Sequence, residues 1–372
     1  MTAKIRVLVV DDSTIIRRLV TDILSADPEI EVVGTAPDGQ VALAKLGTLA
    51  AEVVTLDIEM PVMDGLETLV HLRKTYPRLP VIMFSTLTSS GAVATLDALA
   101  RGATDYVTKP ANVGSVTEAM QHVRSLLIPK IKTLARSAHL AALSETRASL
   151  SQATPTVHRL ATIRPTISKP VVPPTLIGIG VSTGGPNALA ELLPRLPKNL
   201  SVPIVVVQHM PPIFTKHLAE RLDAVSAVRV VEASDGELLQ SGSVYLAPGG
   251  HHLEVMRGER GLELRIVDTP PENSCRPAVD VLFRSIARTC GAASIGCILT
   301  GMGRDGLKGC EAMVQAGARI FVQDQPSSVV WGMPGVVAEA GLAEKVVPLV
   351  GFPFELQQAV RHSTVAPSLV RS

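Results

Sequence analysis

Short apolar, β-branched runs alternate with amphipathic stretches along the first 128 residues. Ile15–Leu24 repeats apolar residues at helical spacing, and Leu66–Leu72 continues that pattern. The runs between such stretches are Ile5–Val10, Glu31–Ala36, Val53–Leu56, Val81–Phe84 and Asp105–Val107. Five strands that alternate with helices predict a doubly wound parallel sheet, a (βα)5 fold. Ligands of such sheets bind where the strands end.

The alternation resumes at Thr175. Its predicted buried strands are Leu176–Val181, Ile204–Gln208, Val228–Val231, Ser294–Thr300 and Ala318–Val322. Three more runs, separated by glycine-containing turns, predict a hairpin-rich insert: Ser243–Leu246, His252–Val255 and Leu262–Val267. We therefore predict an α/β chain of two doubly wound parallel-sheet domains, the second with a hairpin insert and some antiparallel sheet.

Residues 129–174 interrupt the alternation with Ser, Thr, Ala and Pro and carry seven Lys or Arg against one Glu. Lys130–Leu143 can extend the preceding helix, whereas the prolines beyond it favour extended chain. The positive charge has two interpretations, solubility or docking near anionic lipid or an acidic partner. We predict a first domain at 1–128, a basic linker at 129–174 and a second domain at 175–365.

Composition excludes several classes of protein. Aromatic residues make up 3% and the formal net charge is +1, which argues against a nucleic-acid partner. Four cysteines lack C-x-x-C or metal-finger spacing and fit free thiols in a reducing compartment: Cys275, Cys290, Cys297 and Cys310. The first residues do not have a signal-peptide pattern, and no apolar run is long enough to span a bilayer. We expect a cytoplasmic protein without direct membrane insertion.

Three carboxylates follow strands of the first predicted sheet. Asp11 and Asp12 close the first strand and Asp57 closes the third, while Lys109 closes the fifth. Each aspartate alone fits an ordinary strand-end cap. Together they would repel one another unless a cation joined them, and an oxygen-only cluster suits Mg²⁺. One carboxylate could then accept a phosphoryl group whose oxygens pair with the lysine.

The longer motifs around these residues resemble the receiver domain of two-component response regulators. They are Asp11-Asp12, Asp57–Gly65, Ser85 and Tyr106–Pro110. The resemblance implies that Asp57 is the phospho-acceptor, that Asp12, Asp57 and the carbonyl of Glu59 are Mg²⁺ ligands, and that Asp11 binds the ion through water.

The same resemblance assigns the switch. Ser85 and Tyr106 match the hydroxyl and aromatic positions that rearrange on phosphorylation, with Thr86 as a rival for the hydroxyl. Lys109, whose ammonium could pair with the phosphoryl oxygens, is assigned to the same switch. A histidine kinase of the CheA type is the implied phosphodonor.

Ser182 lies in Gly180-x-Ser182-x-Gly184, directly after a predicted strand. Small neighbours suit a nucleophile on a sharp strand-to-helix turn, with helix-start amides as oxyanion donors. The plain alternative for Ser182 is a helix N-cap. A dinucleotide site is disfavoured, because the glycine spacing is not G-x-G-x-x-G and the next strand ends in Gln208-His209 rather than in an acid.

A serine nucleophile needs a base and an acid that orients it. His209 directly follows a buried strand, and Asp305 follows another in a glycine-rich loop, whereas His251 and His252 lie in a turn and are weaker candidates. The order Ser, His, Asp differs from that of α/β-hydrolases.

Four motifs of the second half resemble the catalytic domain of the chemotaxis protein-glutamate methylesterases, the CheB family. They are Gly180–Pro186, Gln208–Pro211, Tyr245–His251 and Leu299–Gly306. The resemblance implies that Ser182 attacks the γ-methyl ester of a chemoreceptor glutamate, with His209 as base and Asp305 orienting it. It also implies glutamine deamidation, and backbone amides near Thr183 and Met302 as oxyanion donors.

In that family the receiver covers the active site until phosphorylation relieves the block, which gives sensory adaptation. Mg²⁺ would serve the receiver, and ester hydrolysis would need no cofactor. The implied partners are the cytoplasmic domains of methyl-accepting chemoreceptors. The main alternative is a response regulator whose second half only binds a partner; a DNA-binding output is disfavoured because no basic recognition helix is evident.

Overall fold

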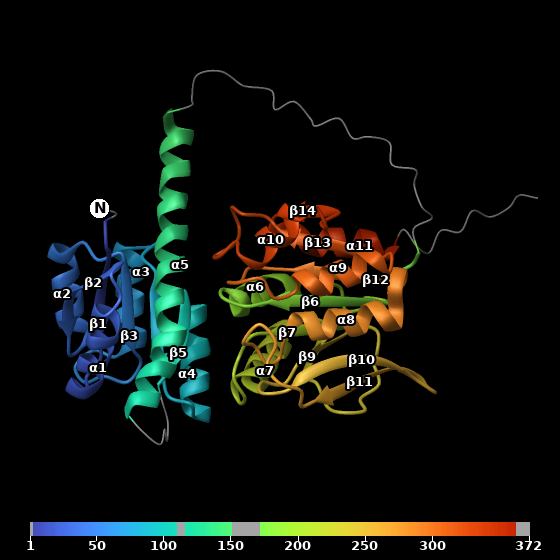
Figure 1. The fold of residues 1–372 in the computed structure, drawn as a ribbon, viewed down its shortest axis with the longest axis horizontal. Coiled ribbons are helices and arrows are strands. Elements are labelled where there is room, and N and C mark those ends of the chain that lie inside the picture. The colour runs from blue at the N-terminus through green and yellow to red at the C-terminus, as the bar shows by residue number, and fades with distance from the viewer. Residues whose placement is uncertain (1–2, 110–115, 151–171, 362–372) are drawn as a thin grey trace, which may run out of the picture.

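The computed structural model describes residues 3–109, 116–150 and 172–361, which form two α/β units (Figure 1). The first unit is a parallel sheet with strand order β2-β1-β3-β4-β5. Its strands are β1 (Ile5–Val10), β2 (Ile30–Ala36), β3 (Val53–Asp57), β4 (Val81–Ser85) and β5 (Asp105–Thr108). Its helices are α1 (Thr14–Ser25), α2 (Gly39–Leu49), α3 (Gly65–Thr75), α4 (Ser89–Ala100) and α5 (Val116–Leu150). This confirms the predicted (βα)5 fold.

Local sequence explains where these helices begin. A side-chain oxygen of Ser13, Asp38, Asp64 or Thr88 accepts a hydrogen bond from a backbone amide in the first turn of α1, α2, α3 or α4, respectively. Such N-caps satisfy amides that have no partner within the helix. The central strands β3 and β4 are buried along their whole length, because helices cover both faces of the sheet.

The second unit contains a seven-stranded sheet in the order β14-β13-β12-β6-β7-β9-β8, with every neighbouring pair parallel. Its strands are β6 (Leu176–Val181), β7 (Ile204–Gln208), β8 (Arg229–Glu232), β9 (Ser243–Leu246), β12 (Ser294–Ile298), β13 (Arg319–Gln323) and β14 (Lys345–Val347). Its helices are α6 (Gly185–Leu192), α7 (Phe214–Val225), α8 (Val279–Cys290), α9 (Leu307–Gln315), α10 (Met333–Glu339) and α11 (Phe352–Arg361), with 3-10 turns at Leu193–Arg195, Gly291–Ala293 and Leu349–Gly351. Two doubly wound parallel domains are therefore confirmed.

The hairpin insert is smaller than expected. Among the strands that the structure describes, only β10 (His252–Gly258) and β11 (Gly261–Val267) pair antiparallel, in a separate two-stranded sheet. The run Ser243–Leu246 was assigned to the insert, and that was wrong: as β9 it lies between β7 and β8 in the main sheet. Its four residues are all buried, as expected of a strand covered on both faces.

Strand order places a switch point at the middle of this sheet. From β6 the chain moves outward through β7 to the edge strand β8 and back to β9, and it later crosses to the other side of β6 through β12, β13 and β14. The carboxyl ends of β12, β6 and β7 therefore lie side by side, and this is where doubly wound sheets bind ligands.

Helix α5 runs past residue 128 to Leu150, so the helix enters the segment predicted to be linker. Lys130–Leu143 does continue the preceding helix. Residues 151–171 of that segment lie outside the described residues. Within the described ranges no helix is long and apolar enough to cross a membrane.

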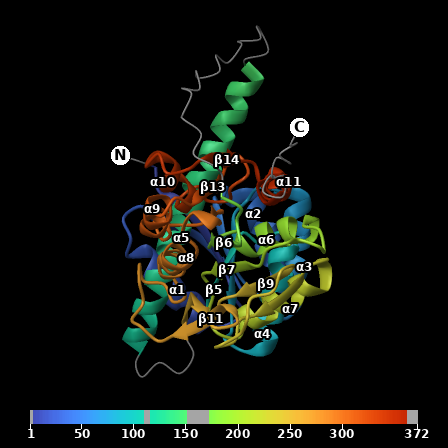
Figure 2. The same cartoon turned by 90° about the vertical axis from the view of Figure 1, so that its right-hand side faces the viewer.

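The first unit packs against the second through α4 and α5 (Figures 1 and 2). Helix α4 contacts α6 and α7. The ring of Tyr106, at β5, stacks on Phe214 of α7 with centroids 5.1 Å apart and planes 6° from parallel. Arg221 of α7 donates to the Asp97 carboxylate of α4 at 2.5 Å. These contacts join α4 and β5 of the first unit to α6 and α7, the helices that follow β6 and β7.

Candidate phosphorylation site and active site

An acidic cluster occupies the carboxyl edge of the first sheet. Asp11 follows β1, Asp57 ends β3, and ligand oxygens of Asp11, Asp12 and Asp57 lie within 4.8 Å of one another. The ammonium of Lys109 lies 3.0 Å from Asp11 Oδ2 and 2.8 Å from Asp57 Oδ2. The structure thus brings together the four residues that sequence placed at separate strand ends.

Charge and burial in this cluster oppose each other. Burial, with the nearby Asp11 charge, raises the pKa of the Asp57 carboxyl to about 6, although Lys109 pulls it down. Burial also works against the Lys109 ammonium, but its ion pairs with Asp57 and Asp11 keep its pKa above the usual value. A cavity of about 190 Å³ adjoins the cluster, lined by Asp12, Asp57, Glu59 and Lys109 among others. Carboxylate oxygens at this spacing, with room for water, fit a hard divalent cation.

The two candidate switch hydroxyls also line that cavity. Ser85 is buried, and its Oγ accepts from Thr95 Oγ1 at 2.6 Å and donates to the Gly91 carbonyl at 3.1 Å, both on α4. Thr86 is exposed. Ser85 therefore connects the acidic cluster to α4, while Tyr106 connects the neighbouring strand to the second unit.

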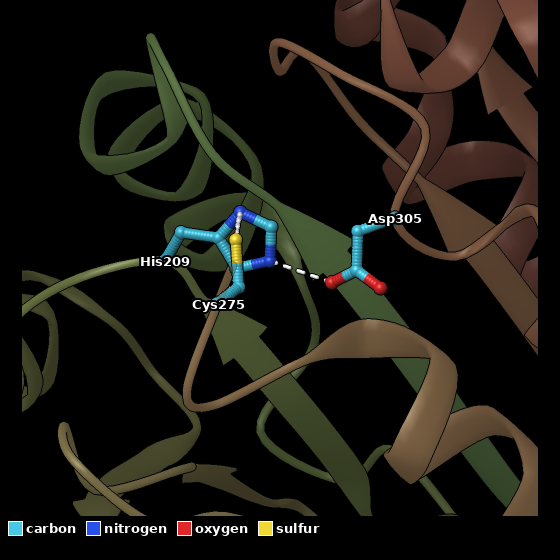
Figure 3. A group of neighbouring side chains, drawn as sticks. All are labelled: His209, Cys275 and Asp305. Carbon is cyan, nitrogen blue, oxygen red and sulfur yellow. Dashed lines mark hydrogen bonds and ion pairs between the residues drawn. The ribbon is translucent and has the colours of Figure 1, made fainter. Parts of the chain in front are cut away.

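In the second unit, three candidate catalytic residues sit at adjacent strand ends. Ser182 follows β6, His209 follows β7, and Asp305 lies in the loop after β12. The His209 ring nitrogen Nε2 lies 2.7 Å from Asp305 Oδ2 (Figure 3). A carboxylate has no proton to give, so Nε2–H donates, and in the neutral ring the lone pair is on Nδ1.

Asp305 is held by a set of donors. Its carboxylate accepts from the backbone amides of Val279 (2.6 Å), Asp280 (3.1 Å) and Gly306 (3.0 Å) and from Asn273 Nδ2 (2.8 Å). Two of these amides begin α8, where the helix dipole favours an anion. Burial would raise the pKa of this carboxyl, but His209 and the amides hold it below its usual value. The Asp305 carboxylate is therefore held in place and ionised, as a group that orients a histidine must be.

Ser182 stands on a sharp turn between β6 and α6. Its amide donates to the Thr300 carbonyl at 3.1 Å and its carbonyl accepts from Gly185 at 2.8 Å. Gly184 has φ of +78°, a conformation that glycine adopts without strain, and Gly184 rather than Ser182 is the N-cap of α6. The N-cap alternative for Ser182 is therefore not supported. Within the described residues, the backbone amides of Thr183 and Met302 donate to no protein acceptor.

His209 meets Asp305 on one side and a cysteine on the other. Its Nδ1 lies 3.6 Å from Cys275 Sγ, and among the described residues no hydrogen bond joins it to Ser182 Oγ. Burial would lower the pKa of His209, but Asp305 and Cys275 outweigh that effect and raise it to about 10. The two rival histidines have other partners: exposed His251 pairs with Asp268, and buried His252 bonds to main-chain groups.

Comparison with known proteins identifies both units. Residues 7–121 match the response regulator receiver domain and residues 177–356 match the CheB methylesterase domain. A protein-glutamate methylesterase/protein-glutamine glutaminase of Nocardioides sp. is 52% identical over 370 residues, which cover 98% of each chain. A protein of the same name from Trichodesmium erythraeum is 50% identical over 349 residues, which cover 93% of this chain and 96% of that one. The chain belongs to the CheB methylesterase family. The crystal structure of the Thermotoga maritima CheB methylesterase catalytic domain matches with a TM-score of 0.49 and 43% identity, over 50% of this chain and 99% of that one.

In this CheB-family chain the receiver lies directly over the candidate active site. A cavity of about 30 Å³ is lined on the hydrolase side by Ser182, Thr183 and His209, and on the receiver side by Asp105 and Tyr106 among others. That volume holds a water molecule or two rather than a glutamyl side chain. In this arrangement of the two domains the cavity has no room for a glutamyl substrate.

Two contacts from the first unit reach the loops that carry the backbone amides of Thr183 and Met302. Thr183 Oγ1 donates to Asp105 Oδ2 at 2.8 Å. On the other loop, Met302 packs with residues of α5, and Thr133 Oγ1 lies 3.3 Å from its sulfur. The receiver of this CheB-family chain thus contacts both sides of the candidate oxyanion site.

Sequence reasoning missed Asn273 and Cys275. Both lie in the loop between β11 and α8, where Asn273 and Ser274 have φ of +52° and +62°. Asn273 bridges Asp305 to Asp280, with its amide nitrogen 2.9 Å from Asp280 Oδ2. No local pattern marks these residues, because their role depends on a loop folding back over the strand ends.

Proposed function

We propose that this chain hydrolyses γ-methyl esters of glutamates in the cytoplasmic domains of methyl-accepting chemoreceptors, and deamidates glutamines there, under control of receiver phosphorylation. The observation that carries the proposal is the meeting of Ser182, His209 and Asp305 at three adjacent strand ends, with His209 bonded to Asp305 at 2.7 Å. The names of its relatives, protein-glutamate methylesterase/protein-glutamine glutaminase, support the substrate class. Removal of receptor methyl groups would give sensory adaptation.

The chemistry follows from the protonation of His209. Asp305 holds the proton on Nε2, so Nδ1 takes the proton of Ser182 as Oγ attacks the ester carbonyl. The amides of Thr183 and Met302 would stabilise the oxyanion. Collapse expels methanol, which receives the proton from Nδ1, and water then hydrolyses the acyl-enzyme to the carboxylate. A primary amide follows the same route and releases ammonia. Since Nδ1 faces Cys275 in this structure, the ring must exchange that contact for Ser182.

Control begins at Asp57. Asp11 (through water), Asp12, Asp57 and the Glu59 carbonyl would hold Mg²⁺, which when bound orients the phosphodonor and offsets charge. The Asp57 carboxylate takes the phosphoryl group from a CheA-type histidine kinase, and Lys109 pairs with its oxygens.

The signal then moves from the acidic cluster to the domain interface. Ser85 turns toward the phosphoryl group and releases its bonds to α4, and Tyr106 leaves its stack on Phe214. Local charge thereby biases a domain contact between two states. The proposed location of this chemistry is the cytoplasm, where receptor tails and kinase meet.

The test is methanol release from a methylated receptor cytoplasmic fragment, with and without Mg²⁺ and a small phosphodonor. We expect release that rises with the phosphodonor. Ser182→Ala and His209→Ala should each lower kcat by roughly 10³–10⁶, and the double variant should lose little more, because a triad acts as a unit.

A serine-directed acylating probe separates this proposal from a second half that only binds. Mass spectrometry should find the label on Ser182. A label on Cys275 would make the thiol the nucleophile, and an unlabelled chain without methanol release would favour the binding-only alternative.

A further inference from the structure

Cys275 is a free, half-buried thiol that the proposed mechanism does not use. The left-handed residues Asn273 and Ser274 turn the chain so that its sulfur reaches His209 Nδ1, at 3.6 Å (Figure 3). Two atoms that metals prefer, a sulfur and an imidazole nitrogen, therefore face each other beside the candidate triad. The other ligand-type atom of this cluster belongs to Asp305.

The spacing of the two atoms fits a shared tetrahedral ion. Zinc bonds of about 2.3 Å to sulfur and about 2.05 Å to nitrogen place the two ligands roughly 3.6 Å apart at a tetrahedral angle. Asp305 cannot join them on the same ion, because it bonds the opposite ring nitrogen. Asp305 instead accepts the hydrogen bond from the other ring nitrogen of His209. Metal-binding histidines usually donate in this way to a carboxylate, which fixes the orientation and tautomer of the ring.

We propose that His209 Nδ1 and Cys275 Sγ bind a thiophilic divalent cation of the Zn²⁺ class, and that this cation inhibits the hydrolase. Binding needs a thiolate and a neutral imidazole, so it releases the thiol proton and, where His209 is protonated, its Nδ1 proton as well, and water completes the coordination shell. Inhibition follows because the ion occupies Nδ1, the atom that must accept the Ser182 proton. The inhibitory part rests on the proposed function; the binding part does not.

This site differs in chemistry from the acidic cluster of the receiver. Sulfur and imidazole select zinc-type ions, whereas the carboxylates of Asp11, Asp12 and Asp57 select hard ions such as Mg²⁺. Saturating Mg²⁺ therefore separates the two sites in one solution. With two protein ligands, the affinity should be well below that of four-ligand structural zinc sites.

The first measurement needs no variant. Full-length protein in excess Mg²⁺, without thiols or chelators, is alkylated with iodoacetamide in the presence or absence of Zn²⁺, and the modified peptides are counted by mass spectrometry. We expect Zn²⁺ to slow alkylation of Cys275 at least about tenfold. Cys290, the other half-buried cysteine, should be unaffected. Equal alkylation of Cys275 with and without zinc would overturn the proposal.

The second measurement uses Co²⁺ as an optical probe. Wild-type protein should show a thiolate-to-cobalt charge-transfer band that disappears in Cys275→Ser and persists in the matched control Cys290→Ser. For each protein, inhibition is measured relative to its own methanol release without zinc. The zinc concentration that gives half-inhibition should be more than about tenfold higher for Cys275→Ser than for wild type, since even residues that only hydrogen-bond to metal ligands change metal affinity on that scale. Thermal melts establish that both variants fold.

The outcomes distinguish the two proposals. A cobalt band that depends on Cys275 in a chain that releases no methanol would support the metal site and refute the proposed function. Normal methanol release with no Cys275-dependent band, or with equal zinc inhibition of wild type and Cys275→Ser, would refute the metal site alone.

Discussion

Replacing Asp105 with alanine should activate the unphosphorylated enzyme. Asp105 is 4% exposed and accepts the hydrogen bond from Thr183 Oγ1 across the domain interface at 2.8 Å. A hydrogen bond to a charged group contributes about 1.5–3 kcal/mol. Because about 1.4 kcal/mol corresponds to tenfold, its loss should lower the closed-to-open ratio by roughly 10- to 150-fold. Basal methanol release should rise toward the phosphorylated rate, which sets its ceiling.

The matched control is Asp97→Ala. It removes another charged contact across the interface, to Arg221, but both of these side chains are well exposed, at 42% and 37%. Exposed ion pairs contribute about 0–1 kcal/mol, so basal release should rise by no more than about fivefold. The assay is the initial rate of methanol release from methylated receptor fragment without phosphodonor.

Two results would refute this reasoning. One is a basal rate in Asp105→Ala equal to wild type, with normal stimulation by phosphodonor. The other is an equal increase in both variants. Asp105 also pairs with Lys130 at 2.6 Å, so thermal unfolding of each variant must show that the receiver remains folded.

Four further predictions concern the two sites. Asp57→Ala should abolish the stimulation by phosphodonor, and a variant that still responds would contradict the assignment. Millimolar Mg²⁺ at pH 7.5 should raise the Tm of wild type more than that of Asp57→Ala, because the ion relieves repulsion in the acidic cluster, and EDTA should reverse the gain. If neutral His209 is the base, kcat/KM measured with EDTA should increase as pH rises toward the His209 pKa of about 10. Cys275→Ala removes a group that raises this pKa, so in that variant the increase should occur at lower pH. A pH profile identical to that of wild type would exclude the contact between Cys275 and His209. Asn273→Ala should lower kcat by roughly tenfold with a smaller change in KM, since it removes one of the hydrogen bonds that hold the Asp305 carboxylate. An effect on KM alone would make Asn273 a substrate contact.

Much of the fold could be predicted because hydrophobic pattern alone marks buried parallel strands. Pairing is a different matter, as β9 shows. Its short run, a serine followed by Val, Tyr and Leu, fits a hairpin or a central strand equally well, and its place between β7 and β8 is decided by tertiary packing. Strand β14 was missed because it has three residues and only Val347 is buried.

The candidate sites follow the same division. Asp57, Ser182 and His209 could be found because parallel strands end at one edge, so a residue just past a strand has a predictable position. Cys275 could not, since its position depends on how a loop closes over that edge. The domain interface was also beyond sequence pattern, because nothing in the α7 sequence indicates that Phe214 meets Tyr106 rather than its own core.

Because receiver and hydrolase are parts of one chain, their contact is intramolecular. Domains tethered in this way meet at an effective concentration on the order of 1 mM. An interface with a Kd of about 0.1 mM, or about 5.5 kcal/mol, then keeps about nine molecules in ten closed. Weakening it by about 2.7 kcal/mol, a hundredfold, leaves about nine in ten open. A contact of this strength would keep the two domains of one chain closed most of the time, yet it would be too weak for a separate receiver at micromolar concentration to close over another hydrolase domain.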